Sequence, residues 1–247
     1  MWYNKGMSDR PLALVTGAAH RLGKAFAICL AKQGYAIALH YRHSATEAAA
    51  TEREIRAMGV PAYSIRADLT RPAKIPYLFS ILDKFDEHLK ILVNSAAVMP
   101  ASSPEELTLE DWDAAMDLNL RAPFLCAQES ARRMTNGGLI VNVSDAGSVK
   151  AWSRYPSYTV SKAGLETLTR ILARAYAPAI RVNAIAPGLV LPSGVVSTQE
   201  WERLVGRLPL KRAAKIEEIT SALEFLIKNE YVTGQTLVVD GGYSLLG

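Results

Sequence analysis

The stretch Thr16-Gly17-Ala18-Ala19-His20-Arg21-Leu22-Gly23 decides the fold of this chain. It follows a short apolar segment and precedes an amphipathic one, Leu22–Gln33, so it is typical of a turn between a strand and a helix. Gly17 allows the turn and the approach of a phosphate, and Gly23 allows the helix to pack close to the sheet. The N-terminus of that helix would attract a pyrophosphate. Because Arg21 stands where a middle glycine might be, the motif alone is weak, and a plain strand–helix turn with a solvent-facing arginine fits it equally well.

Strands and helices alternate along the rest of the chain. The expected strands are Leu12–Thr16, Ala36–Tyr41, Ala62–Ala67, Lys90–Ala96, Leu139–Ser144, Arg181–Ala186 and Thr236–Val239. The expected helices are Leu22–Gln33, Ala45–Met58, Ile75–His88, Leu107–Met134 with a break near Pro123, Ser157–Ala177 and Ile216–Lys228. This alternation predicts an α/β fold, a single-domain Rossmann fold whose doubly wound, mostly parallel seven-stranded sheet has helices on both faces. We expect one catalytic domain over residues 11–247, after a flexible N-terminal extension at 1–10.

Composition excludes several classes of partner. The chain has 247 residues and a formal net charge of +4, which is too mild and dispersed for a nucleic-acid partner but suits small anionic ligands. No apolar run is long enough to span a bilayer, and the first residues lack an apolar signal core, so we expect no membrane partner and a cytoplasmic location. The four histidines lack metal-ligand spacing, and no metal site is predicted.

The end of the second expected strand selects the cofactor. An NAD site needs a carboxylate there to hold the ribose 2′-hydroxyl, but the stretch is His40-Tyr41-Arg42-His43-Ser44 and the first acid is Glu47. An arginine, two imidazoles and a hydroxyl suit a 2′-phosphate, and His20 and Arg21 lie in the neighbouring turn. The sequence therefore predicts NADPH/NADP as cofactor. The alternative is a solvated basic loop.

A phenol and an ammonium, Tyr158 and Lys162, stand at positions i and i+4 of an expected helix, on one face. The ammonium and the positive ring of an oxidised nicotinamide would lower the pKa of the phenol, which could then exchange a proton near neutral pH. By itself this pair is common, and an exposed helix pair is the alternative.

Together these residues resemble the short-chain dehydrogenase/reductase family over nearly the whole chain. The resemblance is carried by Thr16-Gly17…Gly23, Asp68-Leu69, Asn94-Ser-Ala-Ala97, Asn119, Tyr158…Lys162, Pro187-Gly188 and Asp240-Gly241-Gly242. It implies that Gly17, His20, Arg21, Leu22, Gly23, Ala96 and the residues His40 to Ser44 line the cofactor site. It further implies Asp68 and Leu69 at the adenine, Asn94 near the ribose, Pro187 and Gly188 at the nicotinamide, and Lys162 on the nicotinamide ribose. Asn119 would anchor a water relay to Lys162. The resemblance also implies a homotetramer.

Asp145 departs from the common family pattern, which has a catalytic serine there. One branch, the pteridine and dihydrofolate/dihydromonapterin reductases, is similar to this chain at Asp145, at Tyr155, at Thr16–Gly23 and at Leu39–Ser44. Reduction of a pterin C=N bond needs a proton on a ring nitrogen, which a carboxyl group of raised pKa beside Tyr158 could deliver. The expected catalytic residues are Tyr158, Lys162, Asp145 and Asn119, and the expected substrate contacts are Arg21, Met99, Asp145, Tyr155, Tyr158 and Leu189.

Two features leave the substrate open. Ala97 and Met99 replace a serine and a stacking aromatic of some pteridine reductases, and the expected substrate lid, Leu189–Glu200, is typical of no one substrate. We therefore consider three hypotheses. The first is an NADPH-dependent reductase of dihydropterins or dihydrofolate. The second is a general carbonyl or 3-oxoacyl thioester reductase. In that case Arg132 and Arg133 could bind an acidic carrier protein; the alternative is that they only form the solvated end of a helix. The third is a non-catalytic NADPH-binding module.

Overall fold

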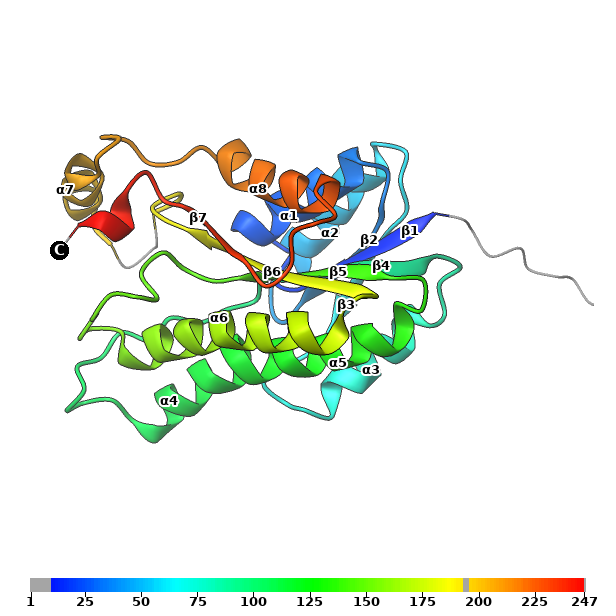
Figure 1. The fold of residues 1–247 in the computed structure, drawn as a ribbon, viewed down its shortest axis with the longest axis horizontal. Helices are drawn as coiled ribbons and strands as arrows, with labels where there is room; N and C mark the ends of the chain where they lie inside the picture. The colour runs from blue at the N-terminus through cyan, green and yellow to red at the C-terminus, as the bar shows by residue number, and fades with distance from the viewer. Residues whose placement is uncertain (1–9, 193–195, 247) are drawn as a thin grey trace, which may run out of the picture.

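Seven strands and eight α-helices follow one another in the computed structural model, which describes residues 10–192 and 196–246 (Figure 1). The strands are β1 (Pro11–Val15), β2 (Ala36–Tyr41), β3 (Ala62–Arg66), β4 (His88–Asn94), β5 (Gly138–Val143), β6 (Ile180–Pro187) and β7 (Thr236–Val239). The helices are α1 (Arg21–Lys32), α2 (Ala45–Arg56), α3 (Lys74–Leu82), α4 (Leu109–Met116), α5 (Ala122–Arg133), α6 (Pro156–Tyr176), α7 (Thr198–Arg207) and α8 (Ile216–Lys228). A π-helical turn, η1 (Asp117–Arg121), and a 3₁₀ turn, η2 (Tyr243–Leu245), complete the described elements.

All seven strands form one parallel sheet in the order β3-β2-β1-β4-β5-β6-β7. The predicted doubly wound Rossmann fold is therefore confirmed. The chain progresses from β1 to β3 in one direction and from β4 to β7 in the other. Because the direction reverses between β1 and β4, the crevice beyond the carboxyl ends of these two strands is the expected ligand site.

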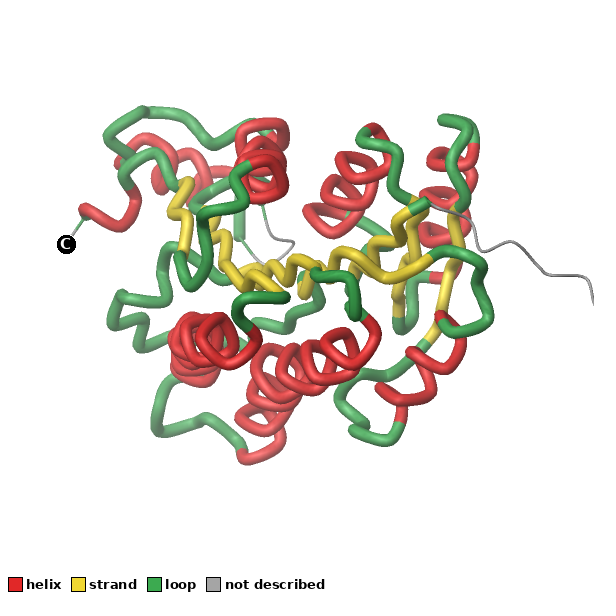
Figure 2. Tube along the Cα trace, turned by 45° about the vertical axis from the view of Figure 1, so that its right-hand side comes forward, coloured by secondary structure: helices red, strands yellow, loops and turns green. Residues whose placement is uncertain are grey.

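Alternate residues of the strands face two separate helical layers. The helices α1, α2 and α8 cover one face of the sheet, and α3, α5 and α6 cover the other (Figures 1 and 2). On β1, Val15 packs into the first layer with Phe26, while Leu14 packs into the second with Phe79. These four side chains are fully buried, which explains the unbroken apolar run of the strand.

The expected helix Leu107–Met134 is not broken near Pro123. Instead, α4, η1 and α5 continue into one another, and Pro123 lies in the first turn of α5. The wider turn of η1, where Ala122 N–H donates to Asp117 O, accommodates the missing N–H and the bulk of the proline ring.

Other boundaries also differ from the sequence expectation. The third helix ends at Leu82 rather than His88, because His88 already pairs with Pro11 in the sheet. The helix α7 was not expected at all. Of the predicted N-terminal extension, residues 1–9 lie outside the described part, and the Arg10 guanidinium donates to Gly59 O at 3.4 Å.

Within residues 10–192 and 196–246, no helix has both the length and the apolar character needed to cross a bilayer. The same described residues contain no cluster of three or more His, Cys, Asp or Glu side chains suited to a metal ion.

Candidate active site

A cleft of about 1050 Å³ runs along the carboxyl ends of the strands, from the turn after β1 to the start of α6. Most residues predicted for the site line it: Gly17, His20, Arg21, Leu22, Gly23, His40, Tyr41, Arg42, His43, Ser44, Leu69, Ala96, Met99, Asp145, Tyr155, Tyr158, Lys162, Pro187, Gly188 and Leu189. Three others, Asp68, Asn94 and Asn119, are not among its lining residues. The structure thus brings most of the predicted residues together in one cavity, whereas these three do not line it.

The glycine turn is held against the loop that follows β4. Gly17 has a φ of +65°, and a Cβ there would lie 2.8 Å from Ala96 Cα. A Cβ on Gly23 would lie 2.1 Å from Gly17 O, so neither position accepts a larger residue without movement. The Thr16 hydroxyl accepts hydrogen bonds from the backbone N–H groups of Ser95 and Ala96. The resulting turn presents the N-terminus of α1 to the cleft, an arrangement that attracts anions.

His40 has a structural role that the sequence did not indicate. Its Nδ1 accepts from Gly17 N–H at 3.2 Å, and its Nε2 donates to Ala67 O at 3.0 Å. Burial lowers the pKa of His40 to about 4, so the imidazole is neutral at physiological pH. The expectation that both imidazoles of the His40–Ser44 stretch bind a phosphate is therefore wrong for His40, because both of its ring nitrogens already have partners.

Arg42, His43 and Ser44 remain together where β2 ends. Arg42 Nη2 lies 3.1 Å from Asp68 Oδ2, and the arginine side chain is 47% exposed. Asp68 also accepts from the Thr70 hydroxyl and N–H, at 2.7 and 3.1 Å. Asp68 therefore orients Arg42 from behind, whereas its neighbour Leu69 lines the cleft where the adenine was expected.

Arg21 contacts the expected lid. Its φ is +53°, an uncommon conformation for a side chain of this size, and its guanidinium donates to Leu191 O at 3.1 Å and to Pro192 O at 3.0 Å. Arg21 lines the cleft as predicted, but in this structure its guanidinium holds the lid backbone. Part of the predicted lid, residues 193–195, lies outside the described residues.

The phenol of Tyr158 donates to Asp145 Oδ2 at 2.7 Å, and Asp145 Oδ1 accepts from Gly147 N–H at 2.7 Å. Burial raises the pKa of Asp145. The pKa of Tyr158 lies well above its ordinary value, first because the phenol is buried and then because Asp145 faces it. The expected lowering of this pKa by the Lys162 ammonium together with an oxidised nicotinamide ring stays a prediction.

Lys162 is buried beside this pair, 3% exposed. Its Nζ donates to Val143 O at 2.6 Å and lies 5.8 Å from the centroid of the Tyr158 ring. Burial lowers the pKa of Lys162 to about 8, and Asp145 opposes that shift.

Two buried asparagines support the site from behind. The Asn119 amide donates to Val98 O and to Ser161 Oγ, at 2.8 and 3.0 Å, and its oxygen accepts from Val98 N–H at 2.9 Å. Asn119 thus fixes the loop after β4 to α6. The Asn94 amide donates to Asn142 Oδ1 at 2.9 Å inside the sheet, so this side chain joins β4 to β5, and the expected position of Asn94 near the cofactor ribose stays a prediction.

Sequence reasoning missed several residues around the site. Glu166 Oε1 on α6 accepts from Ser144 Oγ and Ser148 Oγ, both at 2.7 Å, and so ties down the loop that carries Asp145. Trp201 and Leu204 of α7 and Tyr243 of η2 line the cleft. The helix α7 had a signal in the Ser-x-x-Glu spacing, which is typical of a helix N-terminus, and the Ser197 hydroxyl does accept from Glu200 N–H at 3.2 Å.

The fold and the site together define a Rossmann-type oxidoreductase with a glycine turn at the N-terminus of α1 and a buried tyrosine–aspartate pair in its cleft. The family profile described as enoyl-(acyl carrier protein) reductase matches residues 17–244. A 3-oxoacyl-[acyl-carrier-protein] reductase of Synechocystis sp. is 33% identical over 238 residues, 94% of this chain and 96% of the relative. An NAD-dependent glycerol dehydrogenase of Listeria innocua is 34% identical over 95% of this chain and 94% of its own.

A solved structure shares both the fold and much of the sequence. The alternative dihydrofolate reductase FolM of Brucella suis, crystallised in complex with NADP, has a TM-score of 0.91 and 34% identity, and the match covers 96% of each chain. The chain belongs to the short-chain dehydrogenase/reductase family, as the resemblance of its motifs indicated.

We predict that the buried neutral imidazole makes the stability of the protein depend on pH. Between pH 6.5 and about 4, unfolded His40 is protonated and folded His40 is neutral, so unfolding takes up about one extra proton and stability falls as the pH falls. His40→Asn keeps an acceptor for Gly17 N–H but does not titrate. In urea titrations across this range, its free energy of unfolding should depend less steeply on pH. His43→Asn, at an exposed histidine, is the control and should keep the wild-type slope; equal slopes for all three proteins would contradict the prediction.

Proposed function

We propose that this enzyme is an NADPH-dependent reductase of dihydropterin- or dihydrofolate-type substrates. The observation that carries the proposal is the 2.7 Å hydrogen bond between Tyr158 Oη and Asp145 Oδ2 inside the cleft. An ionised Asp145 accepts the hydrogen bond of the Tyr158 phenol and so competes with a substrate atom for that hydrogen. A protonated Asp145 instead donates to Tyr158 Oη and frees the phenol proton for the substrate.

Reduction of a C=N bond adds a hydride to carbon and a proton to nitrogen. When bound, NADPH supplies the hydride. The proton passes from Tyr158 Oη to the ring nitrogen, and Asp145, whose pKa burial raises, returns a proton to the phenol. Lys162, held by Val143 O, keeps a positive charge 5.8 Å from the centre of the Tyr158 ring, which favours the phenolate that forms as the proton leaves. This route needs a carboxyl group next to the tyrosine, and a serine could not store the second proton.

The residues at the end of β2 fit a 2′-phosphate. Arg42 is half exposed and oriented by Asp68, and His43 and Ser44 lie beside it at the start of α2. The nearest carboxylate, Asp68, points at Arg42 rather than into the cleft, which suits a phosphorylated ribose better than a free hydroxyl. The NADP complex of the Brucella suis enzyme supports the same cofactor for this chain.

The second candidate function, reduction of 3-oxoacyl thioesters, is favoured by the name of the Synechocystis relative. Two observations speak against it. Asp145 occupies the site beside the phenol, and both arginines considered for carrier docking are engaged elsewhere. Arg132 pairs with Glu129, and Arg133 pairs with Asp83 and Glu129 at 2.7 and 2.6 Å.

The same proposal includes a homotetramer that works in the cytoplasm. Large apolar side chains are exposed along the outer helices of one layer, at Leu109 on α4, Phe124 on α5, and Val160 and Ile171 on α6. Leu109 and Ile171 are 73% and 59% exposed. Burial of such a stripe against a second copy would stabilise an oligomer.

We predict that Arg42→Ala weakens NADPH binding by about tenfold or more and leaves NADH binding within about twofold, because a charge-assisted contact to the 2′-phosphate is lost. Calorimetry with both cofactors measures this. Arg71→Ala removes another arginine beside Asp68 that does not line the cleft, and it serves as the matched control. Equal weakening of both cofactors would show that Arg42 does not recognise the phosphate.

The substrate class is tested by following NADPH oxidation with dihydrobiopterin, dihydromonapterin, dihydrofolate and an acetoacetyl thioester. We expect turnover of at least one pterin, and Asp145→Ser should lower its kcat by about 100-fold while NADPH binding stays unchanged. The reason is that a serine in place of Asp145 has no acidic proton to return directly to Tyr158.

Two results would reject the proposal. One is turnover of the thioester alone by the wild-type enzyme. The other is an unchanged pterin kcat in Asp145→Ser, which would remove the carboxyl group from the reaction.

A further inference from the structure

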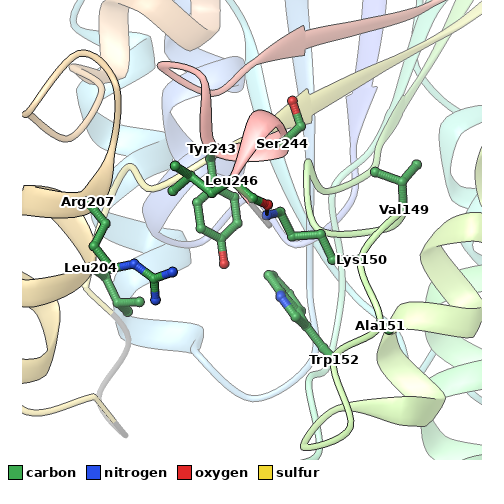
Figure 3. Close-up of a pocket in the computed structure, with 9 residues that line it drawn as sticks. All are labelled: Val149, Lys150, Ala151, Trp152, Leu204, Arg207, Tyr243, Ser244 and Leu246. Atoms are coloured by element: carbon green, nitrogen blue, oxygen red, sulfur yellow. Dashed lines mark hydrogen bonds between the residues drawn. The ribbon is translucent and has the colours of Figure 1, made fainter.

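A second cavity of about 590 Å³ opens beside the main cleft, between the loop after β5, the helix α7 and the C-terminal turn (Figure 3). It shares Trp152, Leu204 and Tyr243 with the main cleft, so the two spaces adjoin around these side chains. Asp145 is close enough to raise the pKa of Tyr243, after the larger effect of burial. The second cavity therefore begins next to the proposed reaction centre, and the mechanism above makes no use of it.

Two cations from different elements face this cavity. Lys150 Nζ lies 4.7 Å from the centroid of the Tyr243 ring and donates to Leu246 O. Arg207 of α7 directs its guanidinium toward the space in front of the Tyr243 hydroxyl (Figure 3). Over residues 10–192 and 196–246, no hydrogen bond or ion pair of Arg207 is found, and no carboxylate side chain lines the cavity. An arginine that faces a cavity and has no acidic partner among the described residues favours an anionic ligand.

Two aromatic rings form the walls between the cations and the reaction centre. Trp152 and Tyr243 have ring centroids 6.0 Å apart and planes tilted by 55°. Faces of this kind contact a flat aromatic group favourably, and an arginine fork matches a carboxylate. The aromatic rings of Trp152 and Tyr243 thus line both the cleft and the second cavity, and the charges of Lys150 and Arg207 belong to the second cavity alone.

We propose that this cavity binds an aromatic, carboxylate-bearing tail of the substrate. This rests on the proposed function and narrows it, because it selects dihydrofolate-type substrates over pterins with uncharged side chains. With the reduced ring beside Asp145 and Tyr158, the tail passes along Trp152 and Tyr243, and its carboxylates meet Arg207 and Lys150.

The kinetic test uses the full enzyme saturated with NADPH. Arg207→Gln should raise the KM for dihydrofolate by about tenfold, since one charge-assisted contact at a partly exposed site is lost. The KM for uncharged dihydrobiopterin and both kcat values should stay within about twofold. Arg203→Gln, an exposed arginine of the same helix outside the cavity, is the control and should match the wild type. An unchanged dihydrofolate KM in Arg207→Gln, or an equal rise for both substrates, would overturn the proposal.

A binding test that needs no turnover separates this proposal from the proposed function. The enzyme saturated with NADP⁺ is titrated with p-aminobenzoylglutamate, which carries the tail without the pterin. Saturable binding that Arg207→Gln weakens and Arg203→Gln preserves is the expected result. If the wild type does not bind the fragment, the tail site is wrong even where pterins are reduced. If it binds but no pterin is reduced, the proposed function fails and the anion site stands.

Discussion

The phenol of Tyr158 and the carboxyl group of Asp145 face each other across 2.7 Å, in a part of the cleft where burial disfavours charge on either group. A pair in this position titrates as a unit, and the number of protons it holds decides whether it can give one away. When the pair holds one proton, the phenol hydrogen is engaged in a hydrogen bond to the Asp145 carboxylate. With two, the phenol hydrogen is free for the substrate. Much of the surrounding structure serves to hold this pair in place.

That support comes from three directions. Gly147 N–H and, through Ser144 and Ser148, the Glu166 carboxylate fix the loop that carries Asp145. Val143 O holds the Lys162 ammonium, and Asn119 ties α6 to the loop after β4. The π-helical turn that contains Asn119 widens the helix at this point and also accommodates Pro123. The irregular backbone of η1 therefore lies where the Asn119 side-chain amide is buried against α6.

The sequence predicted what depends on local pattern. Alternating elements predicted a doubly wound parallel sheet, although not the order of its strands, and the turn at Gly17, the basic residues after β2 and the Tyr158–Lys162 pair lie in one cleft as expected. It did not predict what depends on tertiary contacts. His40 resembled a phosphate ligand because its burial between Gly17 and Ala67 arises only when β2 is inside the sheet. Similarly, α7 and Tyr243 are distant in sequence from the cleft that they complete, and polar residues on α7 obscured its apolar face.

The charges along the cleft give the two proposals a common basis. Arg42 and Arg21 line the cleft around the glycine turn, Asp145 lines it beside Tyr158, and Arg207 and Lys150 line the adjoining second cavity. Placed beside Asp145, an anionic reacting group would be repelled whenever the carboxyl group is ionised, whereas a neutral ring with an N–H or a protonatable nitrogen would not. Ligands with negative charge at their ends and a neutral reacting centre therefore fit the cleft and the second cavity together. A phosphorylated dinucleotide from one side and a carboxylate-tailed pterin from the other satisfy this distribution, and a small uncharged ketone would leave half of it unused.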